Sequence, residues 1–271
     1  MNASSQARAN AVTLTASALV GLGMLAGCTS GGSSAAPPTA TTPAARATPA
    51  ASPSAMSAAR LLSGALAAVR AGGSVHVDIT SHSPDDSVTY SDDATGNGGR
   101  QVITFNGTGH ATILLIDGVD YVQADAQALH GFFQAPLAQA ERAAGRWISV
   151  RPGEKLGTST YDDVTAGITL SSVATELEVG SPLSETAPAT VAGQPVIGVQ
   201  APLPASDGLP GAKLVLYVTD DSALRPVRYE LVGAGSTQNT ISFSRWGERL
   251  SLTAPAHAVP ASSFTAGSVT V

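Results

Sequence analysis

The chain has 271 residues, of which 43% are apolar, 13% charged and 4% aromatic, and its formal net charge is −6. This length suits one domain or two, and the apolar content is too high for a disordered protein. Its 14 basic residues against 20 acidic ones argue against nucleic-acid binding, which depends on attraction to phosphates. The single cysteine excludes an internal disulfide framework and a cysteine-rich metal site.

The first 27 residues have the features of an export signal. Residues 11–25 form an uncharged apolar run, shorter than the roughly 20 residues that a membrane-spanning helix needs, and a single charge, Arg8, precedes it. The run leads into a tetrapeptide that ends in the only cysteine of the chain: Leu25, Ala26, Gly27 and Cys28. We therefore expect residues 1–27 to be a lipoprotein signal peptide.

This tetrapeptide resembles the lipobox of bacterial lipoproteins. Small residues before the cleaved bond fit a peptidase cleft, and a cysteine thiol can carry a thioether-linked diacylglycerol. Two acyl chains hold a protein firmly on a membrane. We expect diacylglyceryl-Cys28 to anchor the mature protein to the extracytoplasmic face of the cell membrane, in the cell envelope. The alternative is an ordinary secretory signal with a chance cysteine.

Residues 28–56 form an expected tether between the anchor and a folded domain. After Cys28 the segment consists almost wholly of Ser, Gly, Ala, Pro and Thr, with Arg46 as its one charge. Such a composition cannot bury enough apolar surface to offset the entropy lost on ordering, so we expect a disordered spacer. As a random coil it would hold the domain on the order of 30 Å from the membrane. Residues 57–271 are expected to form a single domain.

The domain begins with a predicted helix. Apolar residues between 61 and 69 recur at spacings of three and four, which places them on one helical face. Ser57 is a suitable N-cap, and Gly72-Gly73 ends the helix.

Asp117-Gly118 predicts a type I′ hairpin turn further along the chain. Period-two alternation predicts strands and one turn-rich stretch: strands at 74–80, 87–91, 100–106, 110–116 and 119–124, with the turn at 92–99.

The middle of the chain is predicted to be largely helical. Residues 126–145 have a helical composition interrupted by Pro136, which indicates two short helices or a helix and a loop. Apolar residues within 160–179 have near-helical spacing, with Gly180 as the stop. The remaining segments are predicted strands and hairpin turns: strands at 147–150, 189–200, 212–219, 227–232, 240–246 and 250–254, and turns at 193–194 and 220–222.

This order of elements predicts an α+β fold, with helices packed on one side of a long, curved antiparallel β-sheet (a half-barrel). Two strands, 110–116 and 213–219, are apolar on both faces. A sheet covered on both sides, or wrapped around an apolar interior, explains that pattern. Helices on one face and a long loop on the other explain it equally well.

Several short motifs resemble the mycobacterial-type envelope lipoproteins grouped as LppX/LprG-like, which have a LolA/LolB-like fold. Beyond the lipobox and the tether, these motifs lie at 117–122, 145–150, 193–199, 216–218, 226–229 and 242–247. The resemblance implies a half-open antiparallel barrel with helices across its mouth. It also implies a protein that binds acyl chains of lipids or glycolipids in an apolar cavity and assists their transport, with an envelope transporter as a further partner.

A protein of this kind needs an apolar lining, because each exposed CH₂ group of its ligand costs about 0.8 kcal/mol. The candidate lining lies on the predicted strands and, near the mouth, in the helical insert: Val75, Val77, Ile79, Ile113, Leu115, Leu214 and Leu216, with Leu129, Phe132 and Phe133. An ordinary packed core is the alternative for each of these residues. The matching alternative function is a filled-core interaction or scaffolding lipoprotein of the cell envelope, without a ligand.

The sequence contains no signature of an enzyme or a cofactor. Its five histidines lack metal-ligand spacing, and neither a nucleophile elbow nor a phosphate loop is present. We therefore expect no catalytic residues, no metal and no cofactor. Four Asp-Asp pairs lack the surroundings of a calcium loop and suit turns and helix caps: 85–86, 92–93, 162–163 and 220–221.

Overall fold

The computed structural model describes residues 56–177, 179–204 and 209–265. The expected signal peptide, the lipobox, Cys28 and all of the tether but Met56 lie outside these residues. The division of the chain at residues 27 and 56 therefore stays a prediction. In the described part of the chain, no helix is both long and apolar enough to cross a membrane.

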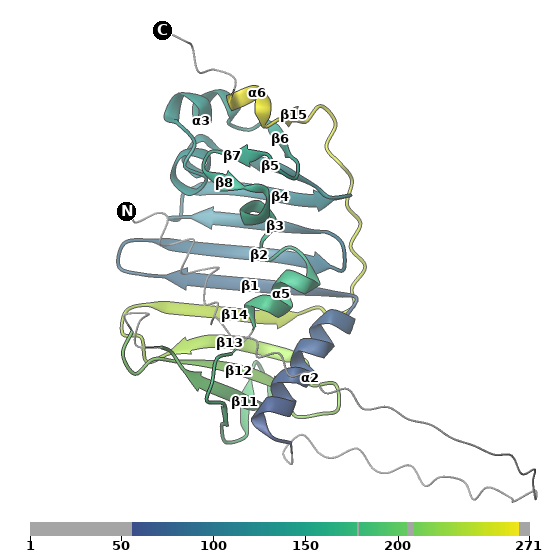
Figure 1. The fold of residues 1–271 in the computed structure, drawn as a ribbon, viewed down its shortest axis with the longest axis vertical. Coiled ribbons are helices and arrows are strands. Elements are labelled where there is room, and N and C mark those ends of the chain that lie inside the picture. The colour runs from purple at the N-terminus through teal and green to yellow at the C-terminus, as the bar shows by residue number, and fades with distance from the viewer. Residues whose placement is uncertain (1–55, 178, 205–208, 266–271) are drawn as a thin grey trace, which may run out of the picture.

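Two antiparallel meanders form most of the structure (Figure 1). The first runs through β1 (Ser74–His82), β2 (Ser87–Thr95), β3 (Gly99–Phe105), β4 (Gly109–Ile116), β5 (Val119–Ala124) and β6 (Trp147–Val150). The second runs through β10 (Ala189–Val191), β11 (Gln194–Pro202), β12 (Lys213–Thr219), β13 (Pro226–Val232) and β14 (Gln238–Ser244). Antiparallel pairing of β14 with β1 joins the two meanders into one sheet.

Four short strands complete the set. β9 (Ser184–Glu185) pairs with β11, and β15 (Val259–Pro260) pairs with β6 in parallel. β7 (Lys155–Leu156) and β8 (Ser159–Thr160) form a separate two-stranded sheet. The main sheet has 13 strands and runs from β10 to β15, which do not pair with each other, so it stays open. Its curvature is visible in Figure 1, and the predicted α+β fold with a curved antiparallel sheet is confirmed.

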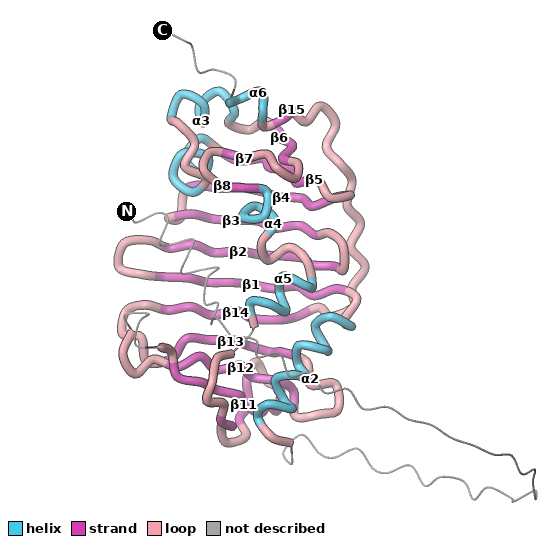
Figure 2. Tube along the Cα trace, viewed as in Figure 1, coloured by secondary structure: helices cyan, strands magenta, loops and turns pink. Residues whose placement is uncertain are grey.

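Helices cover one face of this sheet, which we call the inner face (Figure 2). α2 (Ala58–Ala71) packs on β11, β12 and β13, and also on α5 (Leu170–Glu176), which lies against β2. The π-helical turn η2 (Ala128–Phe132) contacts β3 and β4, and α4 (Tyr161–Thr165) contacts β5. Two further helices, α3 (Leu137–Ala143) and α6 (Ser262–Thr265), lie near the β6 and β15 end of the sheet.

The first helix forms where the sequence predicts it. Leu61, Ala65 and Val69 recur every four residues, so they share one face of α2, and all three are fully buried. The helix ends at Gly72, where an added Cβ would lie 2.9 Å from the ring of Trp246. Close packing of a large side chain against the backbone therefore requires glycine at this position.

Two other local predictions are confirmed. Asp117 and Gly118 have φ angles of 51° and 72°, the pair of positive values that a type I′ turn needs. The insert 126–145 contains the two short helical segments η2 and α3, which are separated by Pro136. Both features depend on residues close in the sequence, so the sequence is sufficient to predict them.

Two predictions about the middle of the chain are wrong. Asp92 and Asp93 do not lie in a turn, because β2 continues through them to Thr95. The single helix expected over 160–179 is two helices, α4 and α5, separated around Gly167, whose φ is +80°. A left-handed residue cannot continue a right-handed helix, so the chain changes direction there and crosses the sheet.

Two strand predictions in the second half also need correction. The segment 189–200 is a hairpin that turns at Ala192 and Gly193, with φ angles of 51° and 79°, one residue earlier than predicted. The strand expected at 250–254 does not form. β14 already pairs with β13 and β1 on its two edges, so the chain that follows runs along the sheet and pairs only at β15 (Figure 1).

Candidate functional site

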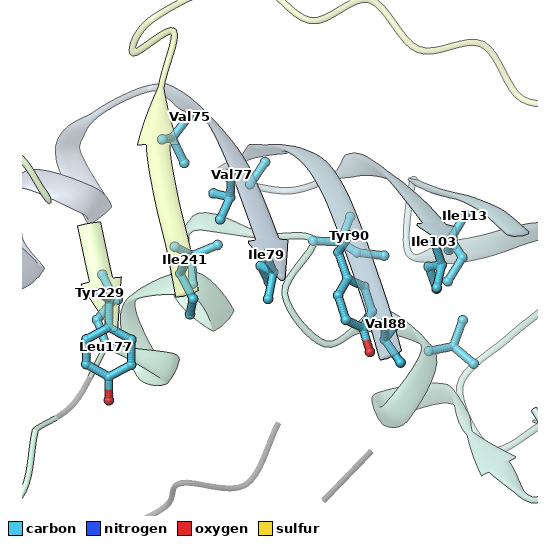
Figure 3. Packing of buried hydrophobic residues seen from close by; sticks show 14 of the residues in the cluster. Val75, Val77, Ile79, Val88, Tyr90, Ile103, Ile113, Leu177, Tyr229 and Ile241 are labelled. Atoms are coloured by element: carbon cyan, nitrogen blue, oxygen red, sulfur yellow. The ribbon is translucent and has the colours of Figure 1, made fainter. Parts of the chain in front are cut away.

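The strand register arranges inner-face side chains into rows that cross many strands. In an antiparallel sheet, directly paired residues point to the same face, and alternate residues of each strand do the same. The longest such row starts on β11 and crosses to β5: Val199, Leu216, Tyr229, Ile241, Ile79, Tyr90, Ile103, Ala111 and Ala124. All of these residues are buried, and Figure 3 shows several of them on one side of the strands. We call this set row 1.

Two further rows run beside row 1. Row 2 comprises Phe243, Val77, Asp92, Gln101, Ile113, Val122 and Ile148. Row 3 comprises Val75, Ala94, Gly99, Leu115, Asp120 and Val150. The three rows are apolar except for two tyrosine hydroxyls, two aspartates and one glutamine, and they contain no basic residue. The inner face is thus a mostly apolar surface that contains two carboxyl groups and no basic side chain in these rows.

The structure brings the predicted lining residues into one buried cluster. Val75, Val77 and Ile79 lie in three successive rows on β1. The other strand residues lie on the same face, on β4 and β12: Ile113, Leu115, Leu214 and Leu216. The insert contributes Leu129, Phe132 and Phe133, which are also buried. That these residues line a lipid cavity stays a prediction, because a packed core would bury them as well.

The helical insert contacts the inner face through aromatic rings. The ring centroid of Phe132 lies 6.3 Å from that of Tyr90 and 6.1 Å from that of Phe105, both in edge-on geometry. Phe133 packs edge-on against Phe132 at 5.1 Å. These distances fall in the range of favourable aromatic pairs. The insert therefore covers the part of the inner face formed by β2 and β3.

A buried polar cluster interrupts the apolar surface beneath α5. Gln101 Nε2 donates hydrogen bonds to Asp92 Oδ2 at 3.2 Å and to the Ala166 carbonyl at 3.5 Å. Burial raises the pKa of Asp92 well above its ordinary value, and the nearby charge of Glu176 raises this pKa further. Burial also raises the pKa of Glu176 to about 7. Both carboxyl groups thus favour the protonated, neutral form more than exposed carboxyls do.

Gly167 lies next to all three side chains of this cluster. A Cβ at Gly167 would lie 3.4 Å from Glu176 Oε1, 3.5 Å from Gln101 Nε2 and 3.7 Å from Asp92 Oδ2. The neighbouring segment is also close to the sheet, since a Cβ at Gly99 would lie 2.4 Å from the Ile168 carbonyl oxygen. The link between α4 and α5 therefore rests directly on β2 and β3.

Asp120 and Tyr229 are two further buried polar groups of the rows. Asp120 Oδ2 accepts a hydrogen bond of 2.7 Å from Thr165 Oγ1, and burial raises the pKa of Asp120 to about 7. The Tyr229 hydroxyl is buried and has no hydrogen-bond partner among the described residues. Burial raises the pKa of Tyr229, and the charge of Glu176 raises it further, so this hydroxyl keeps its proton.

A polar pocket of about 140 Å³ lies at the start of β1, and its lining includes Val75 and Ala94 of row 3. Its lining also includes His76, whose Nδ1 lies 2.7 Å from Asp93 Oδ1, and Arg245, whose Nη2 is 3.2 Å from the same oxygen. These polar groups contact one another and connect the residue after β14 to β1 and β2. No group of three or more His, Cys, Asp or Glu residues suited to a metal ion occurs in the described chain.

Sequence reasoning missed the polar members of the inner face. Asp92 occupies an inward position of the alternating strand Val88, Tyr90, Asp92 and Ala94, and that alternation was the available signal. A buried acid is rare without a partner, so the Asp-Asp pair suggested a turn instead. By contrast, Asp163 caps α4 through a capping box with Thr160, as expected for an Asp-Asp pair.

Comparisons with known proteins identify similar folds. No protein-family model and no curated protein sequence matches the chain. Among solved structures, LprF from Mycobacterium bovis is 18% identical, with a TM-score of 0.46 over 73% of this chain and 97% of that one. LppX from Mycobacterium tuberculosis is 16% identical, with a TM-score of 0.47 over 72% of this chain and 99% of that one.

A more distant similarity extends beyond mycobacteria. A putative outer membrane lipoprotein-sorting protein domain from Vibrio parahaemolyticus is 12% identical, with a TM-score of 0.27 over 72% of this chain and 95% of that one. Each of these structures is similar to this chain in its fold.

Proposed function

We propose that this protein is a membrane-anchored envelope lipoprotein that binds the acyl chains of a lipid or glycolipid and assists their transport. The observation that carries the proposal is row 1, a continuous line of buried, mostly apolar side chains across nine strands of an open sheet. A flexible alkyl chain can be accommodated along such a surface because its CH₂ groups leave water without losing hydrogen bonds. The function needs shape and apolar area, and it needs no catalytic group.

The lipobox and tether support the remaining parts of the proposal. A diacylglyceryl group on Cys28 would hold the protein on the extracytoplasmic face of the cell membrane, where lipids leave the bilayer. The tether would let the domain reach on the order of 30 Å from that surface, toward an envelope transporter or a second membrane. These parts rest on the sequence, since they concern residues outside the described chain.

The test compares two neighbouring leucines on opposite faces of β4. Leu115 lies on the inner face in row 3, whereas Leu114 points to the outer face. Leu115→Trp fills space on the inner face, so we expect it to lower the lipid that co-purifies with the full-length protein by at least about threefold. Leu114→Trp is the matched control and should leave it unchanged. Mass spectrometry of solvent extracts measures the loading, and equal loading of Leu115→Trp and wild type contradicts the proposed site.

The filled-core scaffolding lipoprotein is the second candidate function. It is favoured by the burial of every row 1 residue, which a well-packed core also produces. This function predicts that no lipid co-purifies with wild-type protein. The same extraction therefore separates the two candidates.

A further inference from the structure

Tyr229 is one of the two tyrosines of row 1, and it places a polar atom inside the apolar layer. Its side chain is only 3% exposed, and its hydroxyl has no hydrogen-bond partner among the described residues. Two other tyrosine hydroxyls have partners: Tyr161 donates to the Gly118 carbonyl at 3.2 Å, and Tyr217 bonds to Glu230. A buried hydroxyl without a partner is unfavourable, and such groups are rare in folded proteins. The Tyr229 hydroxyl is therefore available to a ligand.

The direction of this hydroxyl fits that role. Tyr229 is paired with Leu216 on β12 and with Ile241 on β14, so it stands on the inner face between two aliphatic side chains. Figure 3 shows its hydroxyl pointing away from the strands. The hydroxyl thus reaches into the layer between the sheet and the helices, where the proposed function places acyl chains.

The surrounding charges restrict what the hydroxyl can bind. Glu176 is close enough to raise the pKa of Tyr229, so the ionisable group that influences this hydroxyl is an acid. The three rows hold no arginine or lysine to balance an anionic ligand group. A phosphate or a carboxylate would lose its hydration and be left without a counter-ion in a region of low polarity. An uncharged oxygen that accepts one hydrogen bond meets no such penalty.

We propose that the Tyr229 hydroxyl donates a hydrogen bond to an uncharged oxygen, such as an ester carbonyl, of the acyl lipid on the inner face. This inference rests on the proposed function and deepens it by naming a specificity-determining residue. The bond fixes the depth at which the ester enters the apolar layer, since methylene groups alone slide along an apolar surface. Tyr229 thereby selects esterified acyl chains over free fatty acids and over plain hydrocarbon.

The test uses two probes of equal chain length, methyl palmitate and octadecane, with the full-length protein stripped of co-purified lipid. Wild-type protein should bind methyl palmitate about fivefold to tenfold more tightly than octadecane, the ratio that one hydrogen bond provides. Tyr229→Phe removes only the unpartnered hydroxyl, so the fold should persist while the preference disappears. Tyr217→Phe removes a hydroxyl on the outer face, and its preference should match wild type.

A spectroscopic measurement identifies the bond itself. The infrared carbonyl stretch of methyl palmitate labelled with ¹³C at the ester carbon should move to lower wavenumber when bound to wild type, and it should not move in Tyr229→Phe. Palmitate at pH 8 should bind wild type more weakly than methyl palmitate. An unshifted carbonyl in wild type, a preference retained in Tyr229→Phe, or palmitate binding as tight as that of the ester overturns the inference. If neither uncharged probe binds wild type, the proposed function fails and the inference fails with it.

Discussion

The free energy of unfolding depends on the ionisation of Asp120, because burial raises the pKa of this residue in the folded protein. It is fully buried in row 3, and its pKa is raised from an ordinary value of 3.8 to about 7. Between about pH 4 and pH 7 the folded protein therefore holds a proton that the unfolded chain has lost. The free energy of unfolding falls as the pH rises through this window, by up to about 1.4 kcal/mol per pH unit for one group.

Asp120→Asn tests this connection. The amide oxygen can still accept the hydrogen bond from Thr165, but the side chain no longer ionises. We expect the variant to melt at a higher temperature than wild type at pH 8 and to lose less stability between pH 5 and pH 8. Glu141→Gln changes an exposed acid on α3 and should follow wild type. Thermal melts across this range measure both, and an Asp120→Asn curve as steep as wild type contradicts the assignment.

Asp92 shows why single polar residues of the site escape sequence reasoning. A buried acid becomes tolerable only when a partner is present, and its partner, Gln101, lies on the next strand. The Ala166 carbonyl, which accepts the second hydrogen bond from Gln101, is much further along the chain. Apolar members such as Val77 and Ile113 follow from period-two alternation, which is a local property. Tyr229 has the same alternation, but the lack of a partner for its hydroxyl is a property of the folded structure.

At the scale of elements, the conformation of Gly167 sets the path of the segment between β8 and β9 across the inner face. Its φ of +80° separates α4 from α5 and lets the link rest on the buried carboxyl cluster. Helical spacing alone predicted one continuous helix, because Val164, Ile168 and Val173 are all buried whether or not the helix is broken. The position of the break depends on contact with β2 and β3, so it could not be deduced from periodicity.

Gly167→Ala measures the cost of forcing an ordinary residue into this conformation. A non-glycine residue in the left-handed region loses about 1–2 kcal/mol, so we expect the free energy of unfolding to fall by that amount. Gly96→Ala is the control, because an added Cβ there meets nothing within 4 Å and the backbone is not left-handed. Urea denaturation of both variants gives the comparison. Equal stability of the two would show that α4 and α5 do not depend on the glycine.

At the scale of the whole molecule, the sequence predicts the hairpins better than the assembly of the sheet. Asp117-Gly118 identifies one turn from two adjacent residues, as its φ angles confirm. The pairing of β14 with β1 joins segments from opposite ends of the domain, and no local pattern encodes that register. The absence of a strand at 250–254 has the same origin, since it depends on which sheet edges remain unpaired.

Membrane attachment also belongs to this scale. If Cys28 carries the diacylglycerol, Cys28→Ala should move most of the protein from the membrane fraction to the soluble fraction, because the anchor is lost. Immunoblotting of fractionated cells measures the distribution. The uncleaved signal peptide is a second membrane attachment, so N-terminal sequencing of any membrane-bound variant must accompany the blot. A variant that stays in the membrane fraction after cleavage contradicts the proposed anchor.

Photo-crosslinking with an acyl lipid tests the central claim most directly. A methyl ester of a fatty acid with a diazirine in mid-chain, loaded on the full-length protein and irradiated, labels whatever the chain touches. We predict adducts on peptides that contain row 1 residues, above all Ile79, Tyr90 and Ile241, with competition by unlabelled methyl palmitate. Adducts confined to outer-face residues such as Leu114, or no adduct that unlabelled ester displaces, would contradict a lipid-binding inner face.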